Sequence, residues 1–250
     1  MRTNSAPSGN TGHLTPETLP IMLIGSQKWL DIIVEGARAF DIEVSQRQAG
    51  QFAAHAAELL RWNRKINLTA ITDPFEVAVK HFLDSVPAAR HIPVGATLLD
   101  IGSGGGFPGL ALKILMPSLS ATLIDSSRKK VSFLKHVIRT LELENIEALH
   151  IRAEDLAQDP QYRNRFKVVI SRALSSLGLF HRLASPFLIE GGCIIALKGD
   201  RGIEETDELQ AMRTGEGGDP PTAERPIAVT VQKYQLPFSK SRRSIVIINS

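Results

Sequence analysis

The segment from Leu99 to Gly109 holds the residues whose types and spacing best suit chemistry. Asp100, Gly102, Gly104 and Gly106 form the pattern D-x-G-x-G-x-G, directly after a short apolar run and before a helix opened by Pro108. Glycine lets backbone N–H groups approach a ligand that a Cβ atom would block. Open α/β sheets bind ligands where a strand ends and a helix begins. The segment is therefore predicted to bind a nucleoside cofactor, with Asp100 orienting the loop and the ligand.

Two classes of cofactor fit these glycines. The stretch 104–109 also satisfies G-x-G-x-x-G, the pattern of loops that cradle the pyrophosphate of nicotinamide cofactors. The alternating spacing of Asp100, Gly102, Gly104 and Gly106 is instead typical of sites for S-adenosylmethionine, where no pyrophosphate has to be held. This spacing favours S-adenosylmethionine, a methyl donor, as the cofactor. A glycine-rich loop without a ligand is the third interpretation.

A second carboxylate, Asp125, ends the next apolar run about twenty residues further on. At the end of a strand it can accept hydrogen bonds from both hydroxyls of a ribose. Both cofactor classes contain a ribose, so Asp125 does not distinguish them. Asp125 can also serve as the N-cap of the helix that follows, instead of binding the ribose or in addition to it.

These residues lie within an alternation of strands and helices. Strands are predicted at 97–101, 121–124, 146–151, 167–170 and 193–197, and helices at 107–116, 128–141 and 174–188. Such alternation predicts an α/β fold, a parallel sheet with helices on both faces. After a loop at 214–226, the apolar runs 227–234 and 245–248 have no helix between them and predict an antiparallel hairpin. A parallel sheet closed by such a hairpin is typical of the Rossmann-like class I methyltransferases and not of dehydrogenases.

The region before the first strand is predicted to be helical. Ser45 and Gln48 have the spacing of a capping box, and Asp73-Pro74 followed by Glu76 is a second helix start. The expected organisation is a disordered tail at 1–14, an N-terminal helical extension at 15–92 and a methyltransferase domain at 93–250.

Composition excludes several classes of protein. The apolar run 19–24 is too short to span a bilayer, and the first 13 residues lack the order of a signal peptide, which predicts a cytoplasmic protein. Cys193 is the only cysteine and the seven histidines are scattered, so we expect no metal site. A net charge of +3 is too small to demonstrate nucleic-acid binding by itself. Nothing in the sequence indicates an oligomeric state.

Five segments together resemble the RsmG/GidB family in order and spacing. They are 63–85 (NRKINLTAITDPFEVAVKHFLDS), 100–109 (DIGSGGGFPG), 123–130 (LIDSSRKK), 170–173 (ISRA) and 196–199 (ALKG). The resemblance runs from about Trp62 to Gly199 and is weaker through the C-terminal hairpin. It implies an S-adenosylmethionine-dependent enzyme that methylates N7 of a single guanine, position 527 in the 530 loop of bacterial 16S rRNA. The implied partner is 16S rRNA or the small ribosomal subunit.

The resemblance also implies which residues contact the donor. Carried over by position, they are Gly102 and Phe107 in the loop, Ala153 and Glu154 after the third strand, and Arg172 after the fourth. The ring of Phe107 can pack along the donor, and the backbone at 153–154 lies where an adenine edge needs hydrogen bonds. The guanidinium of Arg172 can fork onto a carboxylate or phosphate, or form a surface ion pair instead.

The residue types also bear on which atom is methylated. Methylating C5 of cytosine requires a cysteine nucleophile, and Cys193 lies in an apolar strand. Enzymes that methylate N6 of adenine carry Asn/Asp-Pro-Pro-aromatic after the fourth strand, where this chain has SRAL at 171–174. The lone pair of a ring N7 is free, so no proton has to leave and alignment supplies the acceleration. We therefore predict no catalytic base, and Arg172 and Lys198 are candidates for positioning the substrate.

Three basic runs are predicted to contact RNA phosphates. They are Arg61, Arg64 and Lys65; Arg128, Lys129, Lys130 and Lys135; and Lys240, Arg242 and Arg243 in the hairpin turn. One such run alone is typical of a solvated surface, but three beside a donor pocket favour phosphate contact. Trp62 and Phe107 are candidates for stacking on a flipped base, although Trp62 fits the core equally well.

Two other functions stay open at this point. One is a nicotinamide-dependent oxidoreductase, and the other is a non-catalytic RNA-binding or ribosome assembly factor that keeps the fold.

Overall fold

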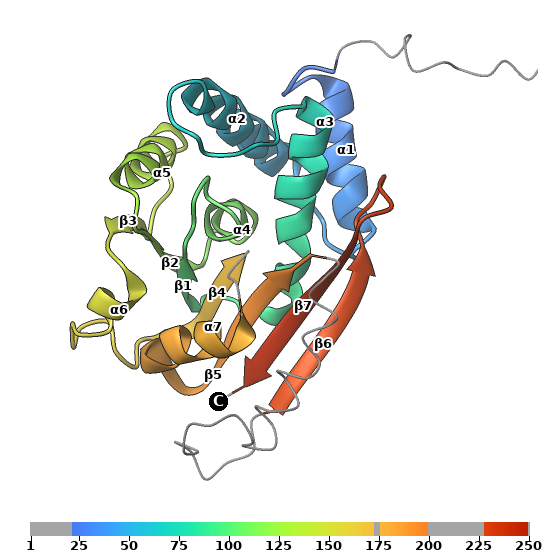
Figure 1. The fold of residues 1–250 in the computed structure, drawn as a ribbon. Coiled ribbons are helices and arrows are strands. Elements are labelled where there is room, and N and C mark those ends of the chain that lie inside the picture. Colours follow the sequence, from blue (N-terminus) through green and yellow to red (C-terminus); the bar gives the residue numbers. More distant parts are fainter. Residues whose placement is uncertain (1–21, 173–175, 200–227, 250) are drawn as a thin grey trace, which may run out of the picture.

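The computed structural model of the chain describes residues 22–172, 176–199 and 228–249. They form a sheet of seven strands in the order β3-β2-β1-β4-β5-β7-β6 (Figure 1). The strands are β1 Thr97–Ile101, β2 Ser120–Asp125, β3 Ile146–His150, β4 Phe166–Arg172, β5 Leu188–Lys198, β6 Ala228–Gln235 and β7 Arg242–Asn249. The first five are parallel to one another, and β7 is antiparallel to both β5 and β6. This confirms the predicted class I methyltransferase fold with its C-terminal hairpin.

Helices precede the sheet and connect its strands. They are α1 Gln27–Arg38, α2 Gln46–Asn63, α3 Pro74–Val77, α4 Gly109–Leu115, α5 Arg128–Thr140, α6 Ala153–Leu156 and α7 Leu177–Ala184. A π-helical turn, η2 Ala78–Leu83, continues α3, and 3-10 helices follow at η3 Val86–His91 and η4 Ser185–Phe187. Both predicted helix starts are confirmed, because Ser45 and Gln48 form a capping box and Asp73 caps α3. In the described ranges no helix is long and apolar enough to cross a membrane.

Side chains alternate between the two faces of the central strands. Leu98 of β1 and Val168 of β4 pack on one face with Leu112 of α4, whereas Leu99 and Val169 pack on the other with Phe180 of α7. A strand directs successive side chains to opposite faces, so consecutive apolar residues are buried only where helices cover both faces. The helical layers therefore explain why these strands read as unbroken apolar runs.

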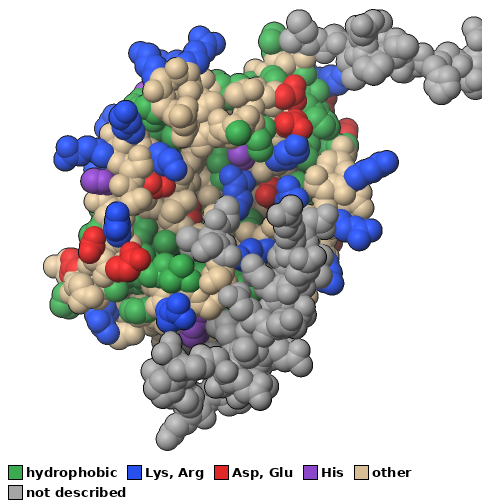
Figure 2. Space-filling model, viewed as in Figure 1, with side chains coloured by type: hydrophobic (Ala, Val, Ile, Leu, Met, Phe, Trp, Pro, Cys, Tyr) green, Lys and Arg blue, Asp and Glu red, His purple; other side chains and the backbone are tan. Residues whose placement is uncertain are grey.

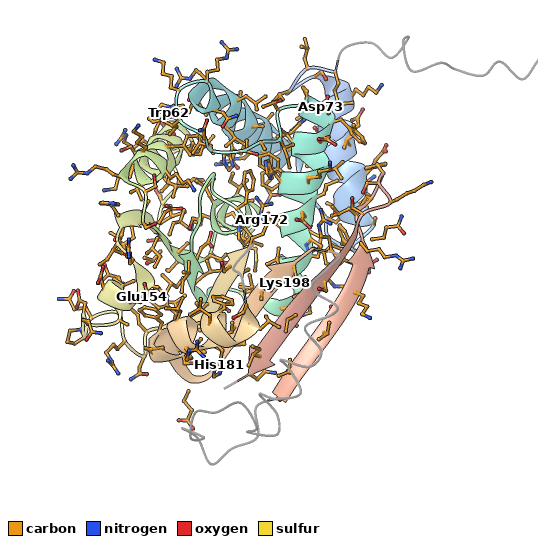
Figure 3. All side chains as sticks on the ribbon, in the orientation of Figure 1. Trp62, Asp73, Glu154, Arg172, His181 and Lys198 are labelled. Carbon is orange, nitrogen blue, oxygen red and sulfur yellow. The ribbon has the colours of Figure 1, made fainter. Side chains whose placement is uncertain are left out.

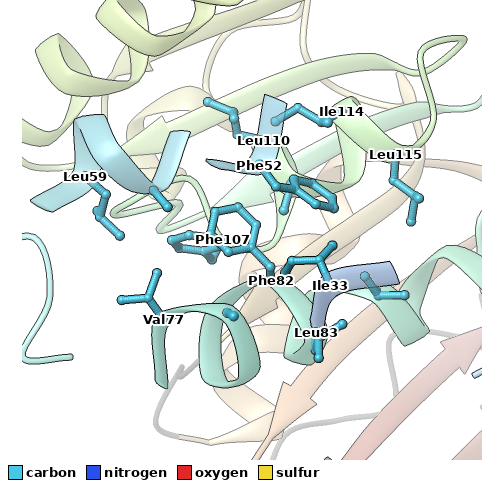
Figure 4. Close-up of a cluster of buried hydrophobic side chains, with 14 of the residues drawn as sticks. Ile33, Phe52, Leu59, Val77, Phe82, Leu83, Phe107, Leu110, Ile114 and Leu115 are labelled. Atoms are coloured by element: carbon cyan, nitrogen blue, oxygen red, sulfur yellow. The ribbon is translucent and has the colours of Figure 1, made fainter. Parts of the chain in front are cut away.

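The N-terminal helices share a core with α4 and α5. Trp29, Phe52 and Phe82 belong to the same buried cluster as Phe107 and Phe133. Figure 4 shows Phe52, Phe82 and Phe107 of this cluster. These helices therefore pack against the loop and helix that follow β1. The division into an extension at 15–92 and a domain at 93–250 stays a prediction. The predicted tail at 1–14 and loop at 214–226 lie outside the described residues.

Candidate functional site

The loop between β1 and α4 lies at the carboxyl edge of the parallel strands. Gly102, Gly104 and Gly106 have φ angles of +77°, +55° and +91°, which residues with a Cβ rarely adopt. Within the part of the chain that the structure describes, a Cβ on Gly102 would meet no atom within 4 Å, and one on Gly104 would meet only the Gly102 carbonyl oxygen at 3.8 Å. On Gly109 it would lie 2.6 Å from Asp100 Oδ2. Gly102 and Gly104 thus border open space, whereas Gly109 packs inward.

Asp100 lies beneath this loop and has no exposed surface. Its Oδ2 accepts a hydrogen bond from the backbone N–H of Gly109 at 2.9 Å, and its Oδ1 has no hydrogen-bond partner among the described residues. Burial raises the pKa of this carboxyl to about 7, although the bond from Gly109 opposes the rise. An unpartnered buried carboxylate is unfavourable, so this oxygen would be stabilised by a ligand that brings a cation or an N–H group.

Asp125, at the end of β2, ties the loop to the next helix. Its Oδ2 accepts from the backbone N–H of Gly104 at 3.0 Å, and its Oδ1 accepts from the backbone N–H of Ser127 at 2.8 Å. Ser127 is the N-cap residue of α5, so the alternative in which Asp125 is that cap is wrong. The backbone N–H of Gly102 also donates to the Ile124 carbonyl at 2.9 Å. The glycine loop is therefore docked against the end of β2.

Phe107 is enclosed by aromatic rings. The imidazoles of His55 and His81 both stack on it, with centroid distances of 4.9 and 4.6 Å, and Phe82 meets it edge-on. The prediction that Phe107 stacks on a flipped base is wrong, because Phe107 is only 3 % exposed and two imidazoles already stack on its ring. Its contact with the donor stays a prediction.

Arg172 turns inward from the end of β4 to meet the helical region (Figure 3). Its Nη1 donates to the Lys80 carbonyl and its Nη2 donates to His81 Nδ1, both at 3.1 Å. Its guanidinium carbon lies 5.1 Å from the centroid of the Phe107 ring, and Asp84 Oδ2 lies 3.8 Å from Nη1. Only about a fifth of the side chain is exposed. The alternative of a surface ion pair is therefore wrong, because Arg172 is part of a buried junction.

Sequence reasoning missed three residues of this junction, which are His55, His81 and Asp84. Burial lowers the pKa of His55 to about 4, and burial together with Arg172 lowers the pKa of His81 to about 3. Both imidazoles are therefore neutral near pH 7. Burial raises the pKa of Asp84, opposed by Arg172 and Arg243. The only signal in the sequence was that His81 and Asp84 lie in the segment 63–85, which carries the family resemblance.

The other predicted site residues lie along the same edge of the sheet. Ala153 is buried at the start of α6, just after β3, and Glu154 beside it is exposed. Lys198 is buried at the end of β5, and Figure 3 shows it near Arg172, with Glu154 farther off. The strand order places β1 and its loop between the β2–β3 half and the β4–β5 half. The structure therefore gathers the predicted residues in two groups flanking the loop.

The predicted basic residues do not form one continuous patch. Arg64, Lys65, Arg128, Lys129 and Lys135 are exposed near the end of α2 and along α5, and Arg61 joins the two helices through Glu58 and His136. Figure 2 shows Lys and Arg side chains spread over much of the face. At the other end of the sheet, Arg242 and Arg243 belong to β7 and not to the turn.

Arg243 differs from the other predicted phosphate contacts. Its Nε lies 3.3 Å from Asp84 Oδ1, and only about a fifth of its side chain is exposed. The prediction that Arg243 contacts phosphate is therefore wrong, because Asp84 already pairs with it. Trp62 packs edge-on against Phe133, which supports its interpretation as a core residue. Within the described ranges, no three His, Cys, Asp or Glu residues are grouped so that they could hold a metal ion.

Comparison with known proteins gives a consistent result. Residues 48–222 match the family model described as GidB, rRNA small subunit methyltransferase G. The ribosomal RNA small subunit methyltransferase G of Geobacter sulfurreducens is 41 % identical over 217 residues, 87 % of this chain and 95 % of that protein. The protein of the same name from Desulfitobacterium hafniense is 43 % identical over 179 residues, 72 % of this chain and 74 % of that protein. Among solved structures, a precorrin-6y C5,15-methyltransferase from Geobacter metallireducens has a TM-score of 0.48 at 11 % identity, covering 73 % of this chain and 90 % of that chain. That structural likeness is too remote to inform the site.

Proposed function

The chain belongs to the family of rRNA small subunit methyltransferase G, and we propose that it transfers the methyl group of S-adenosylmethionine to N7 of guanine 527 in the 530 loop of 16S rRNA. The observation that carries the proposal is the loop between β1 and α4. Three of its glycines have left-handed φ angles, Asp100 lies beneath it and Asp125 holds it from the side.

The charge of Asp100 favours S-adenosylmethionine over a nicotinamide cofactor. The methyl donor carries a sulfonium and an ammonium, and a cation near a buried carboxylate stabilises its ionised form. A nicotinamide cofactor would instead bring the two negative charges of its pyrophosphate toward the same carboxylate, which is unfavourable. The unpartnered Oδ1 of Asp100 and the space bordering Gly102 and Gly104 thus fit the methyl donor. The oxidoreductase alternative is disfavoured on the same ground.

The two groups of residues suggest how the donor lies along the edge of the sheet. Asp125 would accept from the ribose hydroxyls, and Ala153 and Glu154 would border the adenine. Arg172, on the other side of the loop, would contact the carboxylate of the donor or the target guanine. In this arrangement the residues after β2 and β3 would hold the adenosine, and those after β4 and β5 would face the group that is transferred.

The chemistry requires alignment more than proton transfer. When bound, S-adenosylmethionine supplies an electrophilic methyl group on its sulfonium. N7 of guanine has an in-plane lone pair, so no side chain has to remove a proton before attack. Arg172 and Lys198 would hold the guanine in line with the methyl group, and holding two reactants in an attack geometry accounts for much of an enzyme's acceleration.

The exposed basic residues support an RNA partner, either 16S rRNA or the small ribosomal subunit. Those of α2 and α5 lie at one end of the sheet, and Lys240 and Arg242 lie at the other, so an RNA crossing the carboxyl edge would meet both. Basic side chains bind phosphates without regard to sequence, so they would position the RNA while the site itself selects the guanine. An rRNA substrate places the proposed activity in the cytoplasm, where ribosomes are assembled.

The decisive experiment maps N7-methylguanine in 16S rRNA after incubation with the protein and S-adenosylmethionine. Borohydride and aniline should cleave the product at position 527, in naked rRNA or in small subunits, and replacing that guanine by adenine should abolish cleavage. Methylation at another position would contradict the proposed target. Donor binding without methylation of any RNA would instead support the non-catalytic factor.

A matched pair of glycine variants tests the donor loop. Asparagine tolerates left-handed φ angles, so Gly104→Asn should fold while its side chain fills the space of the donor. Gly95→Asn is the control, because Gly95 has φ +72° and open surroundings but precedes β1, away from the carboxyl edge. Calorimetry should show lost donor binding only for the first variant. Equal affinities would exclude the loop from the site.

A further inference from the structure

The π-helical turn η2 brings polar groups to the guanidinium of Arg172. The Lys80 carbonyl accepts from Nη1, and the ring of His81 accepts from Nη2. Asp84, which directly follows η2, brings a carboxylate to 3.8 Å. A π-helical turn inside a helix often marks a functional site, because its wider backbone presents side chains that a regular helix would separate.

The hydrogen bonds of His81 define its tautomer. Arginine has only N–H donors, so Nδ1 of His81 must be the unprotonated nitrogen that accepts from Arg172. The proton therefore lies on Nε2, which donates to Thr69 Oγ1 at 2.9 Å. Thr69 is itself held, because Asn63 Oδ1 accepts from its backbone N–H at 3.0 Å. His81 is thus oriented on both sides, and its acceptor faces Arg172.

Asp84 connects Arg172 to the C-terminal hairpin. Tyr234 of β6 donates its hydroxyl to Asp84 Oδ1 at 3.1 Å, and Arg243 of β7 lies 3.3 Å from the same oxygen. The other carboxylate oxygen, Oδ2, faces Arg172. A carboxylate held in this way presents a charge of defined position to the guanidinium.

We propose that His81 and Asp84 are positioning residues of the methyl transfer reaction, which hold the guanidinium of Arg172 over Phe107 at the carboxyl edge of β4. The inference rests on the proposed function, in which Arg172 contacts the donor or the guanine. A free arginine side chain loses considerable rotamer entropy when it is immobilised. The helical region before the sheet removes that loss in advance, because η2 supplies His81 and the residue directly after it is Asp84.

Two variants of similar size separate positioning from general support. In His81→Asn, the amide oxygen stands near the place of Nδ1 and still accepts from Arg172. In His81→Gln, the amide reaches the place of Nε2 and keeps the bond to Thr69, but it offers Arg172 no acceptor. At saturating donor and rRNA, we expect His81→Gln to lower kcat about tenfold and His81→Asn to stay within about threefold of the wild type.

A double-mutant cycle tests whether His81 acts through Arg172. Adding His81→Gln to Arg172→Ala should lower kcat no further. The control is His55→Gln, which alters the other imidazole stacked on Phe107, whose Nε2 contacts the Gly105 carbonyl. Its effect should multiply with that of Arg172→Ala. The same cycle with Asp84→Asn should also be non-additive.

The outcomes separate this inference from the proposed function. A wild-type protein that methylates no rRNA would refute the proposed function. An active wild type with equal kcat for His81→Gln and His81→Asn, or with multiplicative effects of His81→Gln and Arg172→Ala, would overturn the positioning role alone. Thermal unfolding of every variant identifies losses of activity that arise from unfolding. If His81→Gln does not fold, the double-mutant cycle of Asp84→Asn with Arg172→Ala tests the positioning role instead.

Discussion

Between about pH 4 and pH 7, Asp100 should make the folded protein progressively less stable as the pH rises. Burial raises its pKa from 3.8 to about 7, whereas in the unfolded chain the carboxyl ionises near its ordinary value. Between these two values the folded state holds a proton that the unfolded state has released. The free energy of unfolding therefore falls with rising pH, and the contribution of Asp100 is fully present only below pH 3.8.

The magnitude follows from the size of the shift. About three pKa units correspond to about 4 kcal/mol, lost at about 1.4 kcal/mol per pH unit. Solvent screening does not reduce this figure, because the side chain has no exposed surface. In Asp100→Asn the amide oxygen can still accept from the backbone N–H of Gly109, and nothing titrates. The variant should therefore gain stability relative to the wild type as the pH rises.

Urea unfolding of both proteins at half-unit steps from pH 4.5 to pH 8 measures this difference, since titrations common to both cancel. Parallel curves would refute the assignment of a raised pKa to Asp100. If the proposed donor lies beside this carboxylate, its cationic groups should lower the pKa again. Donor affinity should then rise between pH 5 and pH 7, and calorimetry near pH 6 in two buffers should detect proton release in the wild type but not in Asp100→Asn.

Four further variants test the loop and the RNA surface. Asp125→Ala should lower the free energy of unfolding by about 2–4 kcal/mol, because two backbone N–H groups lose a charged acceptor. Calorimetry should also show weaker donor binding, and an unaltered donor affinity would mean that Asp125 has only a structural role. Gly109→Ala should destabilise the protein by about 1–3 kcal/mol, because the added Cβ would overlap the carboxylate of Asp100. An unchanged Tm in thermal unfolding would contradict this packing. Neutralising Lys240 and Arg242 should reduce the slope of log affinity for rRNA against log salt by about 1.4–1.8, measured by filter binding. Arg243→Gln should instead lower stability, because it breaks a buried ion pair, and the opposite pattern would reverse these assignments.

Local features of the chain were predictable because their causes are local. The strand at 97–101 and the caps at Ser45 and Asp73 match the structure, since apolar runs and capping hydrogen bonds involve residues a few positions apart. The helix after the loop begins at Gly109 and not at Phe107, because residues 102–108 are used by the loop. The order of the hairpin, with β7 between β5 and β6, was not predictable, because either of its strands can pair with β5.

The sequence by itself determined the fold class, the family and the glycine loop between Asp100 and Asp125. Each depends on residue types at short spacing within a segment, such as the glycines directly after the strand that ends at Ile101. Only the tertiary structure decided what surrounds Phe107 and Arg172. His55 and His81 contact Phe107 from 52 and 26 residues away in the chain, and His81 and Asp84 contact Arg172 from 91 and 88 residues away. Contacts between elements so far apart leave no pattern in the sequence. Burial, which shifts the pKa values of these groups, is likewise a property of the assembled core and not of any one segment.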